Sequence, residues 1–232
     1  MENKFKDIQE NIKKLIGKNA IVDGIINSDN YAEAKTRILW VLKEPYSDKN
    51  DWSYQDYLSK DTIKSKIGKE DDTLSYEIFR RILYTSYGLI NKIEYSCVPL
   101  AEEKSVYSIG EEIAYINIKK TGGGAQSDDN EIQKFYNNNE DLLLTQIKEY
   151  DPHIIIFGNT LKYFNLEKLN EIGWDLSDKQ ILNKETNNTH FYPISKDKLC
   201  INAYHPSYWS VTREVYCTEI LNAGLQWREM YK

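Results

Sequence analysis

The segment 204–213 holds the residues whose types and spacing indicate chemistry most clearly. Pro206 lacks a backbone N–H and restricts the preceding His205 to extended geometry, so the imidazole should stand on a stiff turn after a short apolar strand. A large ring, Trp209, and a cation, Arg213, follow within eight residues of the histidine. This combination suits an enzyme that turns a base out of a nucleic-acid stack. The alternative is an ordinary strand-to-helix turn around a buried histidine, which the tripeptide His-Pro-Ser alone favours.

Further polar clusters lie at the ends of other apolar runs of strand length. The runs expected to be strands are 38–42, 113–118, 151–158 and 199–203. The first three end in the clusters 43–46, 117–124 and 158–160. Unbroken apolar runs are typical of parallel strands buried on both faces. Because the crevice of such a sheet lies beyond the carboxyl ends of its strands, all of these clusters should meet at one edge.

Helices must alternate with these strands. Apolar side chains recur with helical spacing, which predicts helices at 5–16, 73–90, 128–149 and 211–230, the third of them capped by Ser127 or Asp128. The predicted fold is α/β: a three-layer α/β/α sandwich with a central, mainly parallel sheet of four strands. The 232 residues fit a single domain, 1–232, in which residues 1–30 form an N-terminal helical extension.

The composition is that of a globular chain, with 41% hydrophobic and 28% charged residues. No apolar run is long enough for a membrane span and no signal peptide is recognisable, so a cytoplasmic protein without a membrane partner is expected. A formal net charge of −6 counts against a nucleic-acid partner, although local basic residues matter more than the total. The three cysteines are widely spaced, which argues against a disulfide framework and a thiolate metal site.

Four ordered segments, at 42–46, 115–120, 154–159 and 205–213, resemble the motifs of the uracil-DNA glycosylase superfamily. The last segment is similar to the pattern His-Pro-Ser-Pro-Leu-Ser-Val-Tyr-Arg of that superfamily, and the first is similar to Gln-Asp-Pro-Tyr. Lys43-Glu44 stands in place of Gln-Asp, and Tyr208-Trp209 stands in place of Pro-Leu. The resemblance covers residues 38–215 and implies a monofunctional glycosylase that flips a pyrimidine out of DNA and leaves an abasic site, with no metal or other cofactor.

The resemblance assigns catalytic and base-binding roles. Glu44 would stabilise positive charge on the deoxyribose and orient a water, and His205 would donate a hydrogen bond to the departing base. Asn117 would read the edge of the flipped pyrimidine, because an amide donates and accepts at once. Pro45 would stiffen the loop, and Tyr46 would exclude a methyl group at C5. A surface glutamate, a packed tyrosine and an amide that serves a loop are the alternatives.

The expected DNA contacts surround these residues. Trp209 would fill the gap left by the extruded base, although ordinary packing of a tryptophan is the alternative. The residues expected to hold phosphates are Lys43, Lys119, Lys120, Ser207 and Arg213. Among Trp52, Tyr54 and Tyr57, one ring is expected to stack on the base, and Tyr57 is taken as a base-binding residue. The glycines at 122–124 are expected either to cradle a phosphate through their backbone N–H groups or only to let the chain turn.

The departures from the superfamily pattern bear on the substrate. Uracil or a modified cytosine or uracil is expected, and the altered motifs are compatible with a hypermodified base in defence against phage. The alternatives are a catalytically inactive DNA-binding module of the same fold and, last, a nucleotide-binding protein that uses the glycine loop. The expected partner is DNA and the expected state is a monomer.

Overall fold

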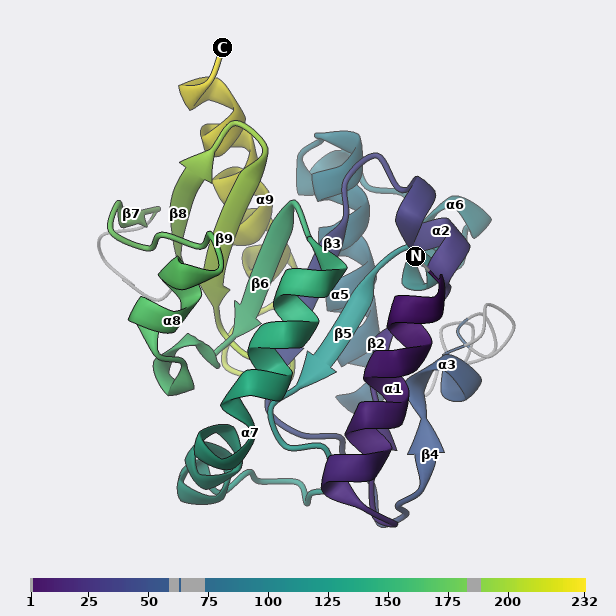
Figure 1. Ribbon diagram of the computed structural model, residues 1–232. Helices are drawn as coiled ribbons and strands as arrows, with labels where there is room; N and C mark the ends of the chain where they lie inside the picture. Colours follow the sequence, from purple (N-terminus) through teal and green to yellow (C-terminus); the bar gives the residue numbers. More distant parts are fainter. Residues whose placement is uncertain (1, 59–62, 64–73, 183–188) are drawn as a thin grey trace.

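A computed structural model describes residues 2–58, 63, 74–182 and 189–232. Its centre is a sheet in which β3 (Ile38–Leu42) pairs in parallel with β5 (Ala114–Asn117) on one side and with β6 (Ile154–Gly158) on the other. The next strand, β9 (Lys198–Ala203), pairs in parallel with β6. These strands match the predicted runs, and their carboxyl ends lie at the same edge of the sheet (Figure 1).

The sheet has seven strands, so the prediction of four is wrong in number. The strand order is β2-β5-β3-β6-β9-β8-β7. The additional strands are β2 (Gly24–Ile25), β7 (Gln180–Ile181) and β8 (His190–Ser195). All of them pair antiparallel, β2 with β5, β8 with β9, and β7 with β8. They were missed because two of them are two residues long and the third contains a proline.

Residues 1–30 are not only a helical extension. The helix α1 (Glu2–Ile16) is followed by β1 (Ile21–Val22), which pairs in parallel with β4 (Trp52–Ser53) in a small second sheet. The next strand, β2, joins the central sheet, and α2 (Ser28–Glu33) follows it. The N-terminal segment therefore completes the sheet edge, which corrects the expected boundary at residue 30.

Helices cover both faces of the sheet (Figure 1), which confirms the α/β class. On one face α5 (Leu74–Asn91) and α9 (Arg213–Met230) pack over a core cluster that includes Trp40 and Ile201. On the other face α1 and α7 (Asp129–Tyr150) pack over a cluster that includes Leu39 and Ile155. The alternation of side chains along buried strands explains why neighbouring residues belong to different clusters. Every helix in the described ranges is too short or too polar to cross a bilayer.

The remaining elements are short. They are α3 (Tyr54–Tyr57), α6 (Lys104–Tyr107), α8 (Leu166–Glu171) and 3-10 helices at Tyr95–Cys97, Ser108–Glu111 and Leu161–Tyr163. Of the predicted helices, 128–149 is confirmed as α7, and the side chain of Asp128 caps it by accepting from two backbone N–H groups. The prediction 73–90 corresponds to α5, except that residue 73 lies outside the described residues.

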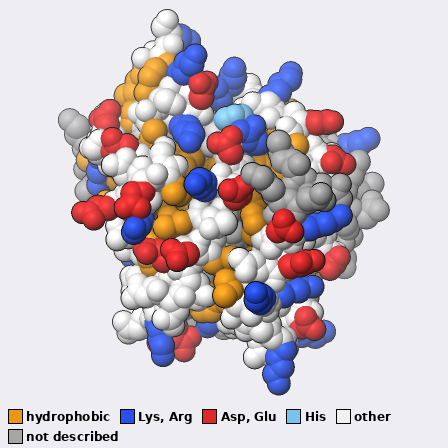
Figure 2. Space-filling model, in the orientation of Figure 1, with side chains coloured by type: hydrophobic (Ala, Val, Ile, Leu, Met, Phe, Trp, Pro, Cys, Tyr) orange, Lys and Arg blue, Asp and Glu red, His pale blue; other side chains and the backbone are white. Residues whose placement is uncertain are grey.

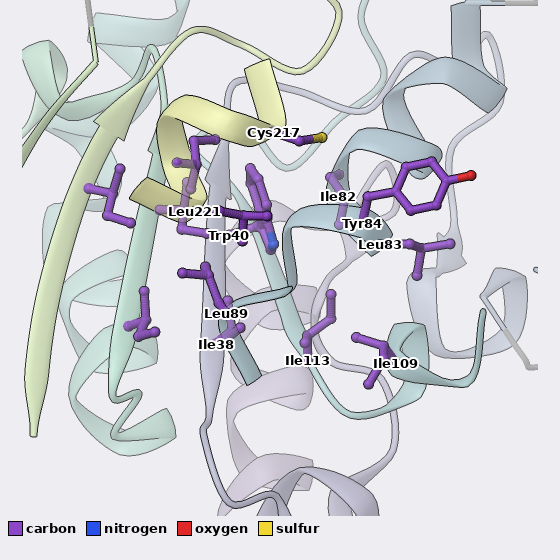
Figure 3. Packing of buried hydrophobic residues seen from close by; sticks show 14 of the residues in the cluster. Ile38, Trp40, Ile82, Leu83, Tyr84, Leu89, Ile109, Ile113, Cys217 and Leu221 are labelled. Carbon is purple, nitrogen blue, oxygen red and sulfur yellow. The ribbon is translucent and has the colours of Figure 1, made fainter. Parts of the chain in front are cut away.

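The core beneath α5 and α9 consists of buried hydrophobic side chains from the two helices and the sheet (Figure 3). Trp40 is fully buried on β3, and its indole N–H donates to Ser86 Oγ at 3.0 Å. The two helices approach closely at Gly224, where an added Cβ would lie 2.4 Å from Leu89. Rigid packing of this kind fixes the strands whose ends carry the candidate site.

Candidate functional site

Glu44, Asn117 and His205 lie at the same edge of the sheet. Asn117 ends β5 and Glu44 follows the adjacent β3, whereas His205 follows β9, which is separated from β3 by β6. Beyond the strands, the backbone of Lys119 donates to the carbonyl of Lys43 at 2.9 Å. The segments that follow β3 and β5 therefore remain side by side beyond the ends of the strands.

The turn that carries His205 approaches the end of β6 closely. A Cβ added at Gly158 would lie 3.0 Å from Leu42 and 3.1 Å from Pro206, so only glycine lets the ends of β3, β6 and β9 come this near. This contact links the loop after β3, which holds Glu44, to the turn after β9.

The carboxylate of Glu44 is held inside the protein. Its side chain is 5% exposed, and Oε2 lies 2.8 Å from Lys119 Nζ. Lys119 also contacts Glu131 at 2.9 Å. Partial burial lowers the pKa of Lys119, but its two carboxylate partners outweigh this effect and the net pKa is above the usual value. Lys119 therefore orients Glu44 and is already neutralised, which contradicts its predicted role as a free phosphate ligand.

The glycine loop closes over Glu44. A Cβ added at Gly123 would lie 2.1 Å from the carboxyl carbon of Glu44. The N–H of Gly123 donates to the carbonyl of Pro45, and the N–H of Gly122 donates to Asn50 Oδ1 at 3.1 Å. Because these two donors are used within the protein, the reading of the glycines as a turn is favoured over a phosphate cradle.

Lys43 is also paired within the protein. Its Nζ donates to Asp129 Oδ1 at 2.8 Å, at the start of α7. Hydrogen bonds from Lys162, Lys43 and Tyr163 hold the pKa of Asp129 well below its usual value. A phosphate would have to compete with this carboxylate for Lys43, so a direct phosphate contact by Lys43 is not favoured.

Lys120 cannot contact DNA, which corrects the prediction. Its side chain is fully buried, and Nζ lies 2.8 Å from Asp23 Oδ1 and 2.8 Å from the carbonyl of Asn117. Asp23 is buried as well, and it accepts the backbone N–H of Asn117 at 2.7 Å and Gln146 Nε2 at 3.1 Å. Burial lowers the pKa of Lys120 against the opposing effect of Asp23. The ion pair therefore holds both the backbone N–H and the backbone carbonyl of Asn117.

The side-chain amide of Asn117 is half satisfied. Its Nδ2 donates to the hydroxyl of Tyr54 at 3.2 Å, whereas its buried Oδ1 has no hydrogen-bond partner among the described residues. Tyr54 stacks on Tyr115, with ring centroids 6.3 Å apart. The ring that contacts the predicted base-reading amide is therefore Tyr54. Tyr57 packs against Trp52, with centroids 5.3 Å apart, as Tyr54 does at 5.0 Å, and its role as a base-binding residue stays a prediction.

The turn at His205 fixes the tautomer of its imidazole. The backbone N–H of Ser207 donates to Nδ1 at 3.2 Å, and Ser207 Oγ lies 2.7 Å from the same atom. Because Nδ1 accepts a hydrogen bond, the neutral ring carries its proton on Nε2. Burial, and then the positive charge of Lys43, lower the pKa of His205 to about 4. His205 is therefore a neutral N–H donor at pH 7, and Ser207, predicted to hold a phosphate, contacts the histidine.

This burial makes the stability of the protein depend on pH. The pKa of His205 falls from 6.5 in the unfolded chain to about 4, so the unfolded state binds more protons between these values. The free energy of unfolding should therefore fall as the pH drops from 6.5 to 4, and His205 should contribute about 3 kcal/mol of this loss. Urea unfolding at several pH values across this range should show that the free energy of unfolding of His205→Gln depends less steeply on pH than that of the wild type. An equal dependence of the free energy of unfolding on pH in the two proteins would contradict the burial of a neutral imidazole.

The two aromatic residues that flank the site point outward. Trp209 is 85% exposed and Tyr46 is 77% exposed. The ordinary-packing alternative for Trp209 therefore does not hold.

Arg213 differs from its prediction, because its guanidinium contacts Glu77 on α5 through two nitrogens, with Nε 2.9 Å from Oε1. Arg213 fastens α9 to α5 and is not a free phosphate ligand.

A cleft of about 630 Å³ opens beside His205. It is lined by Ala125, Gln126, Asn159, His190, Asn202, Ala203, Tyr204, His205, Ser207, Tyr208 and Trp209. His190 is not among the predicted site residues, because β8 is not among the predicted strands. Its Nδ1 is buried without a hydrogen-bond partner in the described part of the chain, and burial lowers its pKa to about 4. Glu44 and Asn117 do not line this cleft.

Charges of both signs are interspersed over the face with α1 and α7 (Figure 2). In the ranges that the structure describes, no group of three or more His, Cys, Asp or Glu side chains is arranged to hold a metal ion. Comparisons of the chain with protein-family models, curated proteins and solved structures gave no significant match. The structure defines the protein as an α/β fold with polar residues gathered at the carboxyl edge of its sheet.

Proposed function

We propose that this protein is a monofunctional DNA glycosylase with the fold of the uracil-DNA glycosylase superfamily. It would flip a pyrimidine, either uracil or a modified cytosine or uracil, and hydrolyse its N-glycosidic bond. The observation that carries the proposal is that Glu44, Asn117 and His205 lie at one edge of the sheet. Each of them is held in place by an ion pair or a hydrogen bond within the protein. These are the residues on which the resemblance in sequence rests.

The chemistry follows from charge. Cleavage of the glycosidic bond builds positive charge on the sugar and negative charge on the leaving base. A fixed carboxylate such as Glu44 stabilises the first, and a neutral imidazole with its proton on Nε2 donates to the second. The imidazole does not have to change its charge before the reaction, because His205 is already neutral at pH 7.

The unpaired Oδ1 of Asn117 supports recognition of a pyrimidine. A buried acceptor without a partner costs free energy, so a ligand that supplies an N–H is favoured. Uracil presents N3–H and cytosine presents its 4-amino group. Asn117 Nδ2 carries two N–H groups, so a base that binds both ends of the amide can leave the hydrogen bond to the Tyr54 hydroxyl in place.

The proposal is tested with an oligonucleotide that carries one deoxyuridine, followed by alkali. A glycosylase leaves an abasic site, which alkali converts into a strand break, and the strand stays intact without alkali. A parallel series with modified pyrimidines tests the hypermodified-base alternative. Salt-dependent DNA binding with no abasic product from any of these substrates would reject the proposal in favour of a binding module.

Trp209→Ala should lower activity on duplex DNA about 10-fold or more, because the ring would no longer fill the gap in the stack. The effect on single-stranded DNA should be smaller, since less stacking has to be broken. The fold should be unaffected, because the side chain is 85% exposed. Tyr231→Ala removes an exposed ring at the carboxyl-terminal cap of α9 and serves as the control. Equal losses on both substrates would count against the wedge.

A further inference from the structure

The cleft beside His205 differs in chemistry from a phosphate site. Among the residues that the structure describes, its lining contains no lysine, arginine or carboxylate. It contains side-chain amides from Gln126, Asn159 and Asn202, and imidazoles from His190 and His205. Amides and neutral imidazoles both donate and accept hydrogen bonds, which is the chemistry that reads the edges of nucleobases.

Aromatic rings complete the lining. Tyr204 and Tyr208 stack with centroids 4.5 Å apart, and Trp209 projects from the same turn. Tyr208 is 39% exposed, so ring surface is presented at the cleft as well as beyond it. Base stacking on such rings tolerates any sequence, because every base presents a π-face. The cleft thus offers both a surface for stacking and groups for edge recognition.

The position of the cleft limits what can occupy it. It shares His205 and Ser207 with the proposed catalytic site, whereas Glu44 and Asn117 lie outside its lining. Its far wall is β8, where His190 pairs in register with Asn202 of β9. An occupant therefore lies next to the flipped base, on the side of the imidazole away from Glu44. Its volume of about 630 Å³ is ample for one nucleotide.

His190 points to a ligand independently of the lining as a whole. Its ring lines the cleft, and its Nδ1 is buried with no hydrogen-bond partner among the described residues. A buried polar atom of this kind is rare in folded proteins and calls for a reason. A nucleobase in the cleft that exchanges a hydrogen bond with Nδ1 would supply the missing partner.

We propose that this cleft binds the nucleobase next to the target on the same DNA strand, and that His190, Asn202 and Gln126 make excision depend on that neighbour. The inference rests on the proposed function and extends it to the sequence context of the substrate. It predicts that the rate of excision varies with the base on one side of the target and not with the base on the other side.

The experiment measures abasic-site formation on single-stranded oligonucleotides in which each neighbour of the target is varied in turn. The wild-type protein should show at least a fivefold ratio between the best and the poorest base on one side. Asn202→Ala and His190→Phe should each reduce this ratio towards one. Asn138→Ala, which removes an exposed amide on α7 outside the cleft, should leave it unchanged. A ratio near one in the wild type, or an equal ratio in the cleft variants, would overturn the inference and leave the proposed function intact.

A second measurement does not need catalysis. The fluorescence of 2-aminopurine is recorded as it is moved along a single-stranded oligonucleotide that contains no excisable base. Stacking in the cleft should quench it at one position, and Asn202→Ala and Gln126→Ala should weaken binding at that position at least threefold. Quenching that these variants leave unchanged would reject the cleft as a base site. Position-specific quenching together with no excision from any substrate would reject the proposed function and retain the base site.

Discussion

Replacement of Glu44 by glutamine should lower the rate of abasic-site formation by about 100- to 1,000-fold. The side chain keeps its size and position at the end of β3, but it loses the negative charge that would stabilise the sugar in the transition state. The substitution also removes the anionic partner of Lys119, which lies 2.8 Å away. Single-turnover kinetics on the best substrate measure the chemical step directly.

The matched control is Glu131→Gln. Glu131 contacts the same lysine at 2.9 Å, but its side chain is 63% exposed on α7 and stands outside the proposed site. The control should stay within about twofold of the wild type, since an exposed ion pair contributes little. A loss of the same size in both variants would show that the charge of Lys119, and not a carboxylate at the sugar, governs the rate.

Replacement of Lys120 by methionine should lower the free energy of unfolding by about 3–5 kcal/mol. The reason is that Asp23 would remain buried without its cation, and the side chains of both residues are 0% exposed. A loss of this size is a large part of the about 5–15 kcal/mol that stabilises a typical domain. Urea unfolding followed by circular dichroism measures it.

The partner substitution makes this prediction specific. In Asp23→Asn/Lys120→Met both charges are absent, so the double variant should be less destabilised than the sum of the two single variants. Lys168→Met provides the control, because Lys168 pairs with Glu171 at the surface at 3.0 Å and its loss should leave the free energy of unfolding close to that of the wild type. Additive losses in the double variant would contradict the buried ion pair.

The sequence predicted the central strands because each is an unbroken apolar run that matches a strand buried on both faces. It did not reveal β8, whose segment contains Pro193 and has one buried block of three residues in place of an alternating pattern. Strands such as β2 and β7, with two residues each, exist only through pairing with longer neighbours. Their formation depends on tertiary contacts and leaves no periodicity to detect.

For the candidate site, the sequence located the residues but not their partners. Glu44, Asn117 and His205 were placed on strand ends, which the rule for parallel sheets brings to one edge. The functions of Lys120 and Arg213 were predicted wrongly because Asp23 and Glu77 lie 97 and 136 residues away in the chain. A basic residue in a loop is read as solvent-facing until such a distant carboxylate is known.

The most direct test is mass analysis of the small molecules released from DNAs that carry uracil or different modified pyrimidines. The account predicts that the wild-type protein releases a free base from at least one of them and leaves the strand unbroken before alkali, whereas Glu44→Gln and His205→Ala release it orders of magnitude more slowly. The contrary result is that no base is released from any DNA, or that both variants release it as fast as the wild type.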